Sequence, residues 1–158
     1  MPAILDALLG NRLVSFSADC LKNDALSVLA GQIAPCLPEV VREVLDKETG
    51  GLAAAFLRRE ADFNTALGDG LAVPHLRIEG ENAPLFTAVG WSKTGLDYGA
   101  ADGLPVHLVV LFCIPDSRKD DYLREMRALM RAVLRQNIIP ALAAAPDLAA
   151  VRNILSPS

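Results

Sequence analysis

His75 is placed where an imidazole can do chemistry, directly after the apolar run Leu71-Ala72-Val73 and Pro74. A neutral imidazole has a nucleophilic nitrogen at physiological pH, and a phosphoryl group attached to it stays labile enough to be passed on. Pro74 lacks an N–H and ends a short buried strand, so we expect His75 at the strand's carboxyl end, where open α/β sheets place ligands. A histidine after a strand is more often a loop or capping residue, and spacing alone leaves both interpretations open.

The turn before this strand is predicted from its glycines. Gly68 and Gly70 flank Asp69, and glycine adopts the backbone angles of a tight turn that residues with a Cβ resist. The residues from 71 to 73 then fit a brief buried strand that presents His75.

These residues together carry a family resemblance. The active-site signature of fructose/mannitol-type enzyme IIA domains resembles two stretches, Arg59-Glu60 through Thr65 and Leu67-Gly68-Asp69-Gly70-Leu71-Ala72-Val73-Pro74-His75. These domains belong to the bacterial phosphoenolpyruvate-dependent phosphotransferase system and include its nitrogen-regulatory branch. In weaker form the resemblance extends from Leu5 to Leu155, with Pro105 to Leu111 as a second matching strand.

The resemblance implies a mechanism. His75 is the expected phosphorylated nucleophile: it would take a phosphoryl group from the histidine-containing phosphocarrier protein and pass it to a transporter IIB domain, or carry it as a regulatory mark. Arg59 matches the family's active-site arginine, and its planar fork of N–H donors suits phosphate oxygens. Arg58 and Arg59 could equally complement the negative end of a helix dipole. Thr65 could donate its hydroxyl to the phosphoryl group or bond the adjacent turn. No metal or organic cofactor is required.

The sequence departs from the family at three positions. Many members carry a second histidine near the start of the helix after the central strand, where this chain has Tyr122, a secondary candidate for the site. A phenol can donate a hydrogen bond to phosphate but cannot supply the charge of an imidazolium. Asp69 stands where asparagine is common, and an acid near His75 would repel phosphate. Ala66 replaces a frequent glycine.

Two alternatives to a phosphoryl carrier follow. The first is a regulatory protein-binding module on the same fold with weak or no phosphotransfer, which the tyrosine at position 122 favours. The second, a hydrolase that uses His75 with acidic residues, is the weakest because no nucleophile–base spacing supports it.

Composition excludes several other classes. The 158 residues fit one domain, residues 1–158, and are 52% hydrophobic and 22% charged, as in globular proteins. A net charge of −4 argues against nucleic acid as a partner. No apolar stretch approaches the ~20 residues that cross a bilayer, and no signal peptide is evident, so we expect no membrane insertion and a cytoplasmic location. The cysteines at positions 20, 36 and 113 lack CxxC spacing and are predicted to be reduced, and no metal motif is present.

Periodicity predicts the elements that must position His75. Strands are expected at 12–16, 71–73, 85–92 and 106–114, and helices at 3–9, 20–33, 39–47, 52–59, 120–135, 137–144 and 147–155. Ser17 and Asp19 are predicted caps of the second helix, and residues 77–83 and 93–103 are predicted loops. His107 is interpreted as structural, and Pro157 and Ser158 as frayed. The fold class is α/β, a central mixed β-sheet with helices on both faces, as in enzyme IIA of the fructose/mannitol type.

Overall fold

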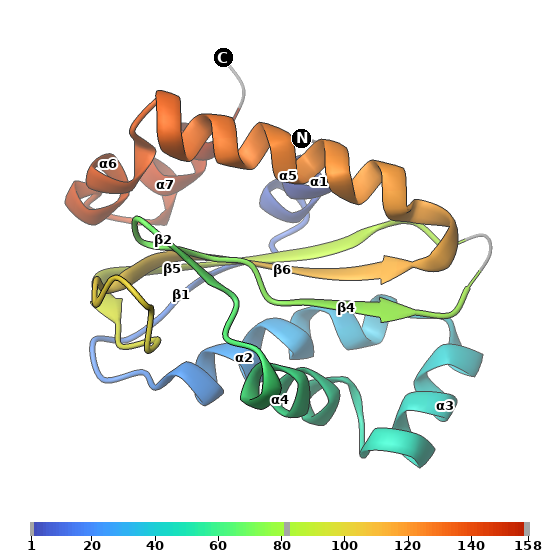
Figure 1. The fold of residues 1–158 in the computed structure, drawn as a ribbon. Helices are drawn as coiled ribbons and strands as arrows, with labels where there is room; N and C mark the ends of the chain where they lie inside the picture. Colours follow the sequence, from blue (N-terminus) through green and yellow to red (C-terminus); the bar gives the residue numbers. More distant parts are fainter. Residues whose placement is uncertain (1, 81–82, 157–158) are drawn as a thin grey trace.

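A mixed β-sheet crosses the middle of the protein and separates two layers of helices (Figure 1). The computed structural model describes residues 2–80 and 83–156. The strands lie in the order β1 (Leu13–Ser15), β5 (Phe86–Leu96), β6 (Val106–Pro115), β3 (Leu71–Ala72) and β2 (Ala66–Gly68), and β4 (His75–Ile78) also pairs with β6. Pairing is antiparallel for β5 with β6 and for β2 with β3, and parallel for β1 with β5 and for β3 and β4 with β6. The predicted mixed sheet is confirmed.

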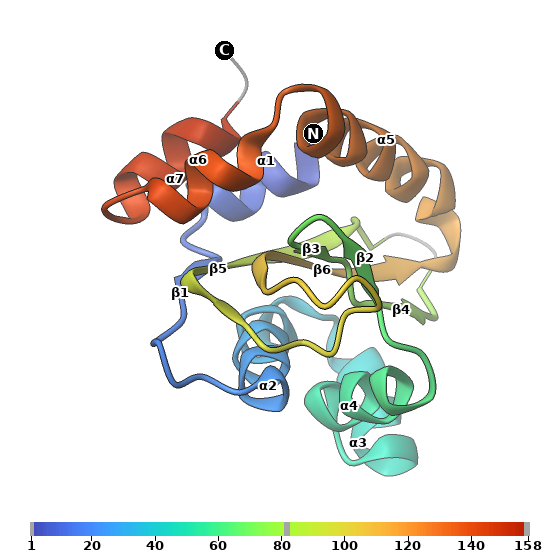
Figure 2. The same ribbon diagram turned by 60° about the vertical axis from the view of Figure 1, so that its left-hand side comes forward.

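Each face of the sheet is covered by its own group of helices (Figures 1 and 2). One group consists of α1 (Pro2–Leu9), α5 (Lys119–Arg135), α6 (Ile138–Ala144) and α7 (Leu148–Leu155). The other consists of α2 (Lys22–Ile33), α3 (Glu39–Thr49) and α4 (Leu52–Asp62). Two short 3₁₀ turns, Ala34–Cys36 and Asp116–Arg118, join neighbouring elements.

Strand β6 is the centre of both cores. Leu108, Val110 and Phe112 belong to the cluster packed against α1 and α5 to α7. Val109, Leu111 and Cys113 alternate with them and belong to the cluster packed against α2 and α4. This alternation explains why the strand reads as a continuous apolar run, because both of its faces are covered.

Long-range pairing changes two of the predicted loops. Residues 75–78 form β4, although the polar sequence after His75 predicted a turn from Arg77, because each of them pairs with a residue of β6 from Phe112 to Pro115. Strand β5 continues to Leu96, four residues beyond the predicted end, after a register shift that starts at Trp91. The predicted fraying of Pro157 and Ser158 lies outside the described residues.

The helices confirm the predicted spans to within a few residues at each end. Helix α2 begins at Lys22 after Leu21, without the predicted side-chain cap from Ser17 or Asp19, and Leu21 is 68% exposed. On α5 the buried side includes Glu125, whose carboxylate accepts a hydrogen bond from the Ala3 backbone N–H at 2.7 Å. An acceptor there satisfies a donor at the start of α1, and burial raises the pKa of Glu125 above its usual value.

All three cysteines are free thiols, as predicted; Cys36 is exposed and Cys113 is buried. Across residues 2–80 and 83–156, no helix is both long enough and apolar enough to cross a membrane.

Gly90 provides a test of the packing between β5 and the segment after β1. A Cβ at this position would lie 2.3 Å from Cζ of Phe16, which is itself buried. We expect Gly90→Ala to lower the free energy of unfolding by about 1–3 kcal/mol, because the strand has no space for a methyl group. Denaturant unfolding followed by circular dichroism measures this change.

Gly31 is the matched control, since it is exposed on α2 and has nothing within 4 Å of a Cβ. Gly31→Ala should raise the free energy of unfolding by about 0.5–1 kcal/mol, as alanine favours the helix. Equal effects of the two substitutions would contradict the described packing.

Candidate functional site

His75 is held between two hydrogen-bonded segments of backbone. The hairpin of β2 and β3 ends just before it, and His75 itself starts β4 in register with Phe112 of β6. The carbonyl of Pro74 accepts the Phe112 N–H at 2.9 Å, which fixes the peptide immediately before the histidine. The sequence predicted His75 at the carboxyl end of a strand; the structure places it between two short strands that share β6 as their neighbour.

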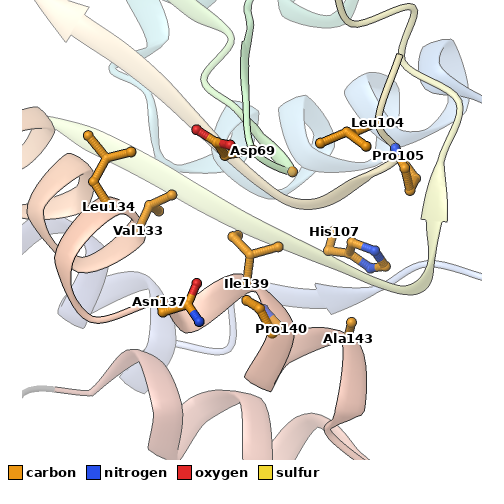
Figure 3. A pocket seen from close by; sticks show the side chains of 11 residues that line it. Asp69, Leu104, Pro105, His107, Val133, Leu134, Asn137, Ile139, Pro140 and Ala143 are labelled. Carbon is orange, nitrogen blue, oxygen red and sulfur yellow. The ribbon is translucent and has the colours of Figure 1, made fainter. Parts of the chain in front are cut away.

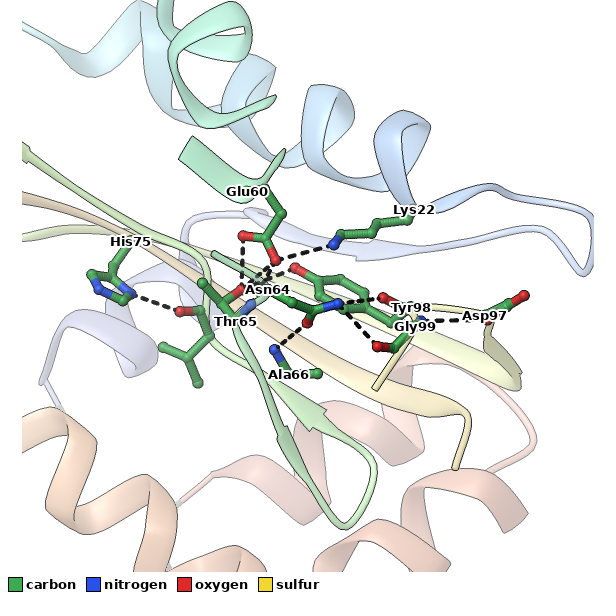
Figure 4. Close-up of polar contacts among 10 residues, drawn as sticks. Lys22, Glu60, Asn64, Thr65, Ala66, His75, Asp97, Tyr98 and Gly99 are labelled. Atoms are coloured by element: carbon green, nitrogen blue, oxygen red, sulfur yellow. Dashed lines mark hydrogen bonds and ion pairs between the residues drawn. The ribbon is translucent and has the colours of Figure 1, made fainter. Parts of the chain in front are cut away.

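The imidazole has a defined tautomer in its neutral form. Nδ1 of His75 lies 2.9 Å from the carbonyl oxygen of Val73, and a carbonyl oxygen can only accept a hydrogen bond (Figure 4). The proton therefore sits on Nδ1. In the neutral ring this leaves the lone pair on Nε2, which is the nucleophilic nitrogen of this tautomer.

Tyr122 lies beside this ring. The centroids of the His75 and Tyr122 rings are 5.8 Å apart, and the phenol ring meets Phe112 edge-on at 5.2 Å. Burial raises the pKa of Tyr122, so the hydroxyl keeps its proton at physiological pH and remains a hydrogen-bond donor. The start of α5 therefore brings a neutral donor next to the histidine.

Arg59 supplies positive charge within electrostatic reach of Tyr122. Its charge acts on the Tyr122 phenol and partly offsets the rise in that pKa, so the guanidinium lies within electrostatic reach of the phenol. Arg59 is exposed in the last turn of α4, and no hydrogen bond or ion pair of its side chain is found among the described residues. Tyr122 thus has the His75 ring as its neighbour and the Arg59 guanidinium within electrostatic reach.

Thr65 makes its side-chain hydrogen bonds with Glu60 and Tyr98. Its hydroxyl donates to the Glu60 carboxylate, with oxygens at 2.8 and 2.9 Å, and its backbone N–H donates to Oε1 of Glu60 at 2.7 Å (Figure 4). The Tyr98 hydroxyl lies 3.1 Å from the same threonine oxygen. Because the single hydroxyl proton of Thr65 goes to Glu60, Tyr98 is the donor in that contact.

Sequence reasoning missed three residues of this network, Glu60, Tyr98 and Lys22. Lys22 forms an ion pair with Glu60 at 3.3 Å, and its ammonium lies 4.3 Å from the centre of the Tyr98 ring. One signal was available in the spacing along α4. Glu60 follows Phe56 by four residues and Leu52 by eight, and both of these apolar residues are buried. A carboxylate in line with an apolar stripe indicates a buried acid with a specific partner.

The second histidine belongs to a separate place in the molecule. Nδ1 of His107 lies 2.8 Å from the Ser92 carbonyl, and the ring borders a cavity of about 490 Å³ between β6 and α6 (Figure 3). Asp69 lines the same cavity, so it lies at the far end of the hairpin from His75. The expectation that Asp69 stands near His75 and repels phosphate is therefore wrong.

The geometry around His75 suits transient attachment of an anionic group. A nucleophilic nitrogen, a guanidinium and a neutral hydroxyl are the groups that a phosphoryl acceptor needs. Across the described residues, no cluster of three or more histidine, cysteine, aspartate or glutamate side chains is arranged to hold a metal ion.

The family model for EIIA 2 of the phosphoenolpyruvate-dependent sugar phosphotransferase system matches residues 33–157. The chain is 31% identical over 102 residues to the phosphotransferase system fructose-specific EIIABC component of Bacillus subtilis, covering 65% of this chain but only 16% of that protein. It is 28% identical over 134 residues to a nitrogen regulatory protein of Pseudomonas aeruginosa, covering 85% of this chain and 82% of that one.

Solved structures of low sequence identity share the fold. The nitrogen regulatory protein IIA-Ntr of Neisseria meningitidis superimposes with a TM-score of 0.65 at 21% identity, covering 94% of this chain and 99% of that one. IIA mannitol of Escherichia coli superimposes with a TM-score of 0.66 at 17% identity, covering 93% of this chain and 98% of that one. A chain from a complex of enzyme IIA mannitol with phosphorylated enzyme IIB mannitol, also from Escherichia coli, superimposes with a TM-score of 0.58 at 17% identity. The match covers 91% of this chain and 94% of that one.

Proposed function

This chain belongs to the EIIA 2 family of the phosphoenolpyruvate-dependent sugar phosphotransferase system, and we propose that it is a phosphoryl carrier that uses His75. The donor is the histidine-containing phosphocarrier protein. The acceptor is a IIB domain, a class of partner seen with the mannitol enzyme IIA of Escherichia coli, or the phosphoryl group remains on His75 as a signal.

The observation that carries the proposal is the hydrogen bond from Nδ1 of His75 to the Val73 carbonyl. It leaves the Nε2 lone pair free to attack the phosphorus of the donor phosphohistidine. The new Nε2–P bond forms as the donor's N–P bond breaks, and that bond's electron pair returns to the donor imidazole, which carries a proton on its other ring nitrogen and so leaves as a neutral ring. Nδ1 of His75 keeps its proton, so the phosphorylated His75 ring takes over the positive charge that the donor ring loses, and no water, metal or oxidant enters the step.

Charge stabilisation falls to Arg59 and Tyr122. Phosphoryl transfer depends on positioning and on stabilising the charge of the equatorial oxygens more than on covalent chemistry by the protein. The guanidinium can donate to two of those oxygens, and the phenol can donate to one. Thr65 was a third candidate, but its hydroxyl proton is committed to Glu60, so we assign it no contact with the phosphoryl group.

A regulatory role on the same site is the second candidate. A relative that matches over most of both chains is named a nitrogen regulatory protein, and Tyr122 stands where an imidazole is expected. A neutral phenol stabilises the charge of a transferring phosphoryl group less than a cation does, so we expect slower onward transfer, which leaves room for a role in binding a partner.

Phosphorylation of His75 is the first test. We expect wild-type protein incubated with phosphoenolpyruvate, enzyme I and the phosphocarrier protein to gain one acid-labile phosphoryl group by intact mass, and His75→Ala to gain none. His107→Gln is the control, because that histidine lies in the separate cavity. Labelling of His75→Ala, or no labelling of the wild type with a matched donor system, would contradict the carrier function.

Arg59 can be separated from its neighbour in a second experiment. Arg58 and Arg59 are both exposed in the last turns of α4, but only Arg59 acts electrostatically on Tyr122. We expect Arg59→Gln to lower the initial phosphorylation rate by about 100-fold, as loss of a charged donor at a transferring group does, and Arg58→Gln to change it less than about threefold. Equal losses would mean that general surface charge steers the donor.

Tyr122→Phe tests the phenol. This change keeps the ring that packs on Phe112 and removes the hydroxyl. The phosphorylation rate should fall about tenfold through the lost hydrogen bond. Because burial raises the pKa of Tyr122, the hydroxyl stays protonated between pH 6 and pH 9, so the ratio of the two rates should not change across that range. A ratio near one would leave the ring with a packing role only.

A further inference from the structure

We propose that Glu60 is a positioning residue for His75, acting through Thr65 and the backbone of Val73. The proposal rests on the proposed function of His75. Glu60 has no contact with the imidazole itself, and it acts on the orientation and tautomer of the ring.

The first link joins Glu60 to Thr65. The carboxylate is 5% exposed and accepts both the backbone N–H and the hydroxyl of Thr65 at 2.7 to 2.9 Å. Two donors from one residue fix the orientation of the peptide as well as its position. Thr65 is the residue where the chain leaves α4 and enters the hairpin that precedes His75.

The second link joins Thr65 to Val73. The Thr65 carbonyl accepts the Val73 N–H at 3.0 Å, one step beyond the paired residues Ala66 and Ala72 of the hairpin. The Val73 carbonyl then accepts the Nδ1 proton of His75 at 2.9 Å. On the other side, the Pro74 carbonyl accepts the Phe112 N–H at 2.9 Å, and the flanking strands β3 and β4 also pair with β6. Glu60 therefore supports the attachment of Val73 on the side away from β6.

The placement of Glu60 is costly without such a role. It lies near the C-terminus of α4, where the helix dipole disfavours an acid, and it is buried, which disfavours a charge. Lys22 from the first turn of α2 offsets this cost with an ion pair, and Tyr98 donates to the Thr65 oxygen that Glu60 holds. Helices α2 and α4 and the loop after β5 each contribute a residue to this network, and the network fixes the position of Thr65 (Figure 4).

Glu60→Gln tests the proposal directly. The amide keeps the volume, but it replaces one of the two oxygens that lie within 2.9 Å of the Thr65 hydroxyl by a donor and removes the charge that pairs with Lys22, so it holds Thr65 less firmly than the carboxylate does. We expect ¹⁵N NMR of the imidazole nitrogens to show the Nδ1–H tautomer of neutral His75 in the wild type and a detectable Nε2–H population in the variant. The phosphorylation rate should fall about tenfold or more, through misorientation of the nucleophile.

The chain contains its own reference signal and a matched variant. His107 makes the same kind of bond, from Nδ1 to the Ser92 carbonyl, so its tautomer should stay unchanged in every variant. Glu125→Gln removes another buried carboxylate that accepts a backbone N–H, at α1, and should leave the His75 tautomer and the phosphorylation rate at wild-type values. Thr65→Ser keeps both donors and should behave as wild type, whereas Thr65→Val loses the hydroxyl and should resemble Glu60→Gln.

The outcomes are separable. A wild-type His75 tautomer in both Glu60→Gln and Thr65→Val would overturn the proposal, and so would an equal change in Glu125→Gln. If Glu60→Gln fails to fold, the comparison of Thr65→Val with Thr65→Ser tests the proposal, with the His75 tautomer and the phosphorylation rate as the readouts. The NMR measurement needs no phosphoryl donor, so failure of the carrier function would appear as absent labelling of wild-type protein and leave the tautomer result independent.

Discussion

The hydrogen bond from Nδ1 of His75 to the Val73 carbonyl is the contact on which the site depends. A carbonyl oxygen cannot donate, so this bond selects the tautomer and leaves Nε2 as the nucleophile of the neutral ring. The acceptor is a backbone atom two residues earlier, and its direction is set by the peptide path through Pro74. The surrounding fold keeps this short segment of backbone in place.

Strand β6 supplies the fixed frame for this path. Its side chains alternate between the two cores, so it is packed on both faces. Phe112 has two roles in the frame: its N–H binds the Pro74 carbonyl, and its ring receives the edge of Tyr122. The same residue thereby sets the separation between the histidine and the start of α5.

Charge is distributed unevenly around the nucleophile. The chain carries a net charge of −4, and in the proposed function a phosphoryl group would bring further negative charge to His75, which Arg59 is the cation assigned to offset. The nearest acid in the network, Glu60, is neutralised by Lys22 and directed at Thr65. The neutral phenol at position 122 adds a hydrogen-bond donor beside His75 but no positive charge. This balance bears on both candidate roles, because it affects how long a phosphoryl group stays on His75.

The sequence alone was enough to predict the glycine turn before His75 and the buried strand β6, since both follow from local chemistry: glycines with positive φ and an unbroken apolar run. The role of His75 as nucleophile stays a prediction. The sequence also predicted the mixed sheet with helices on both faces. It did not reveal that residues 75–78 form a strand, that Asp69 lies away from His75 or that Thr65 is bound by Glu60. Those facts depend on partners from distant parts of the chain, such as Phe112, Tyr98 and Lys22. Only the packing of α2, α4 and β6 around the hairpin decides which donor meets which acceptor.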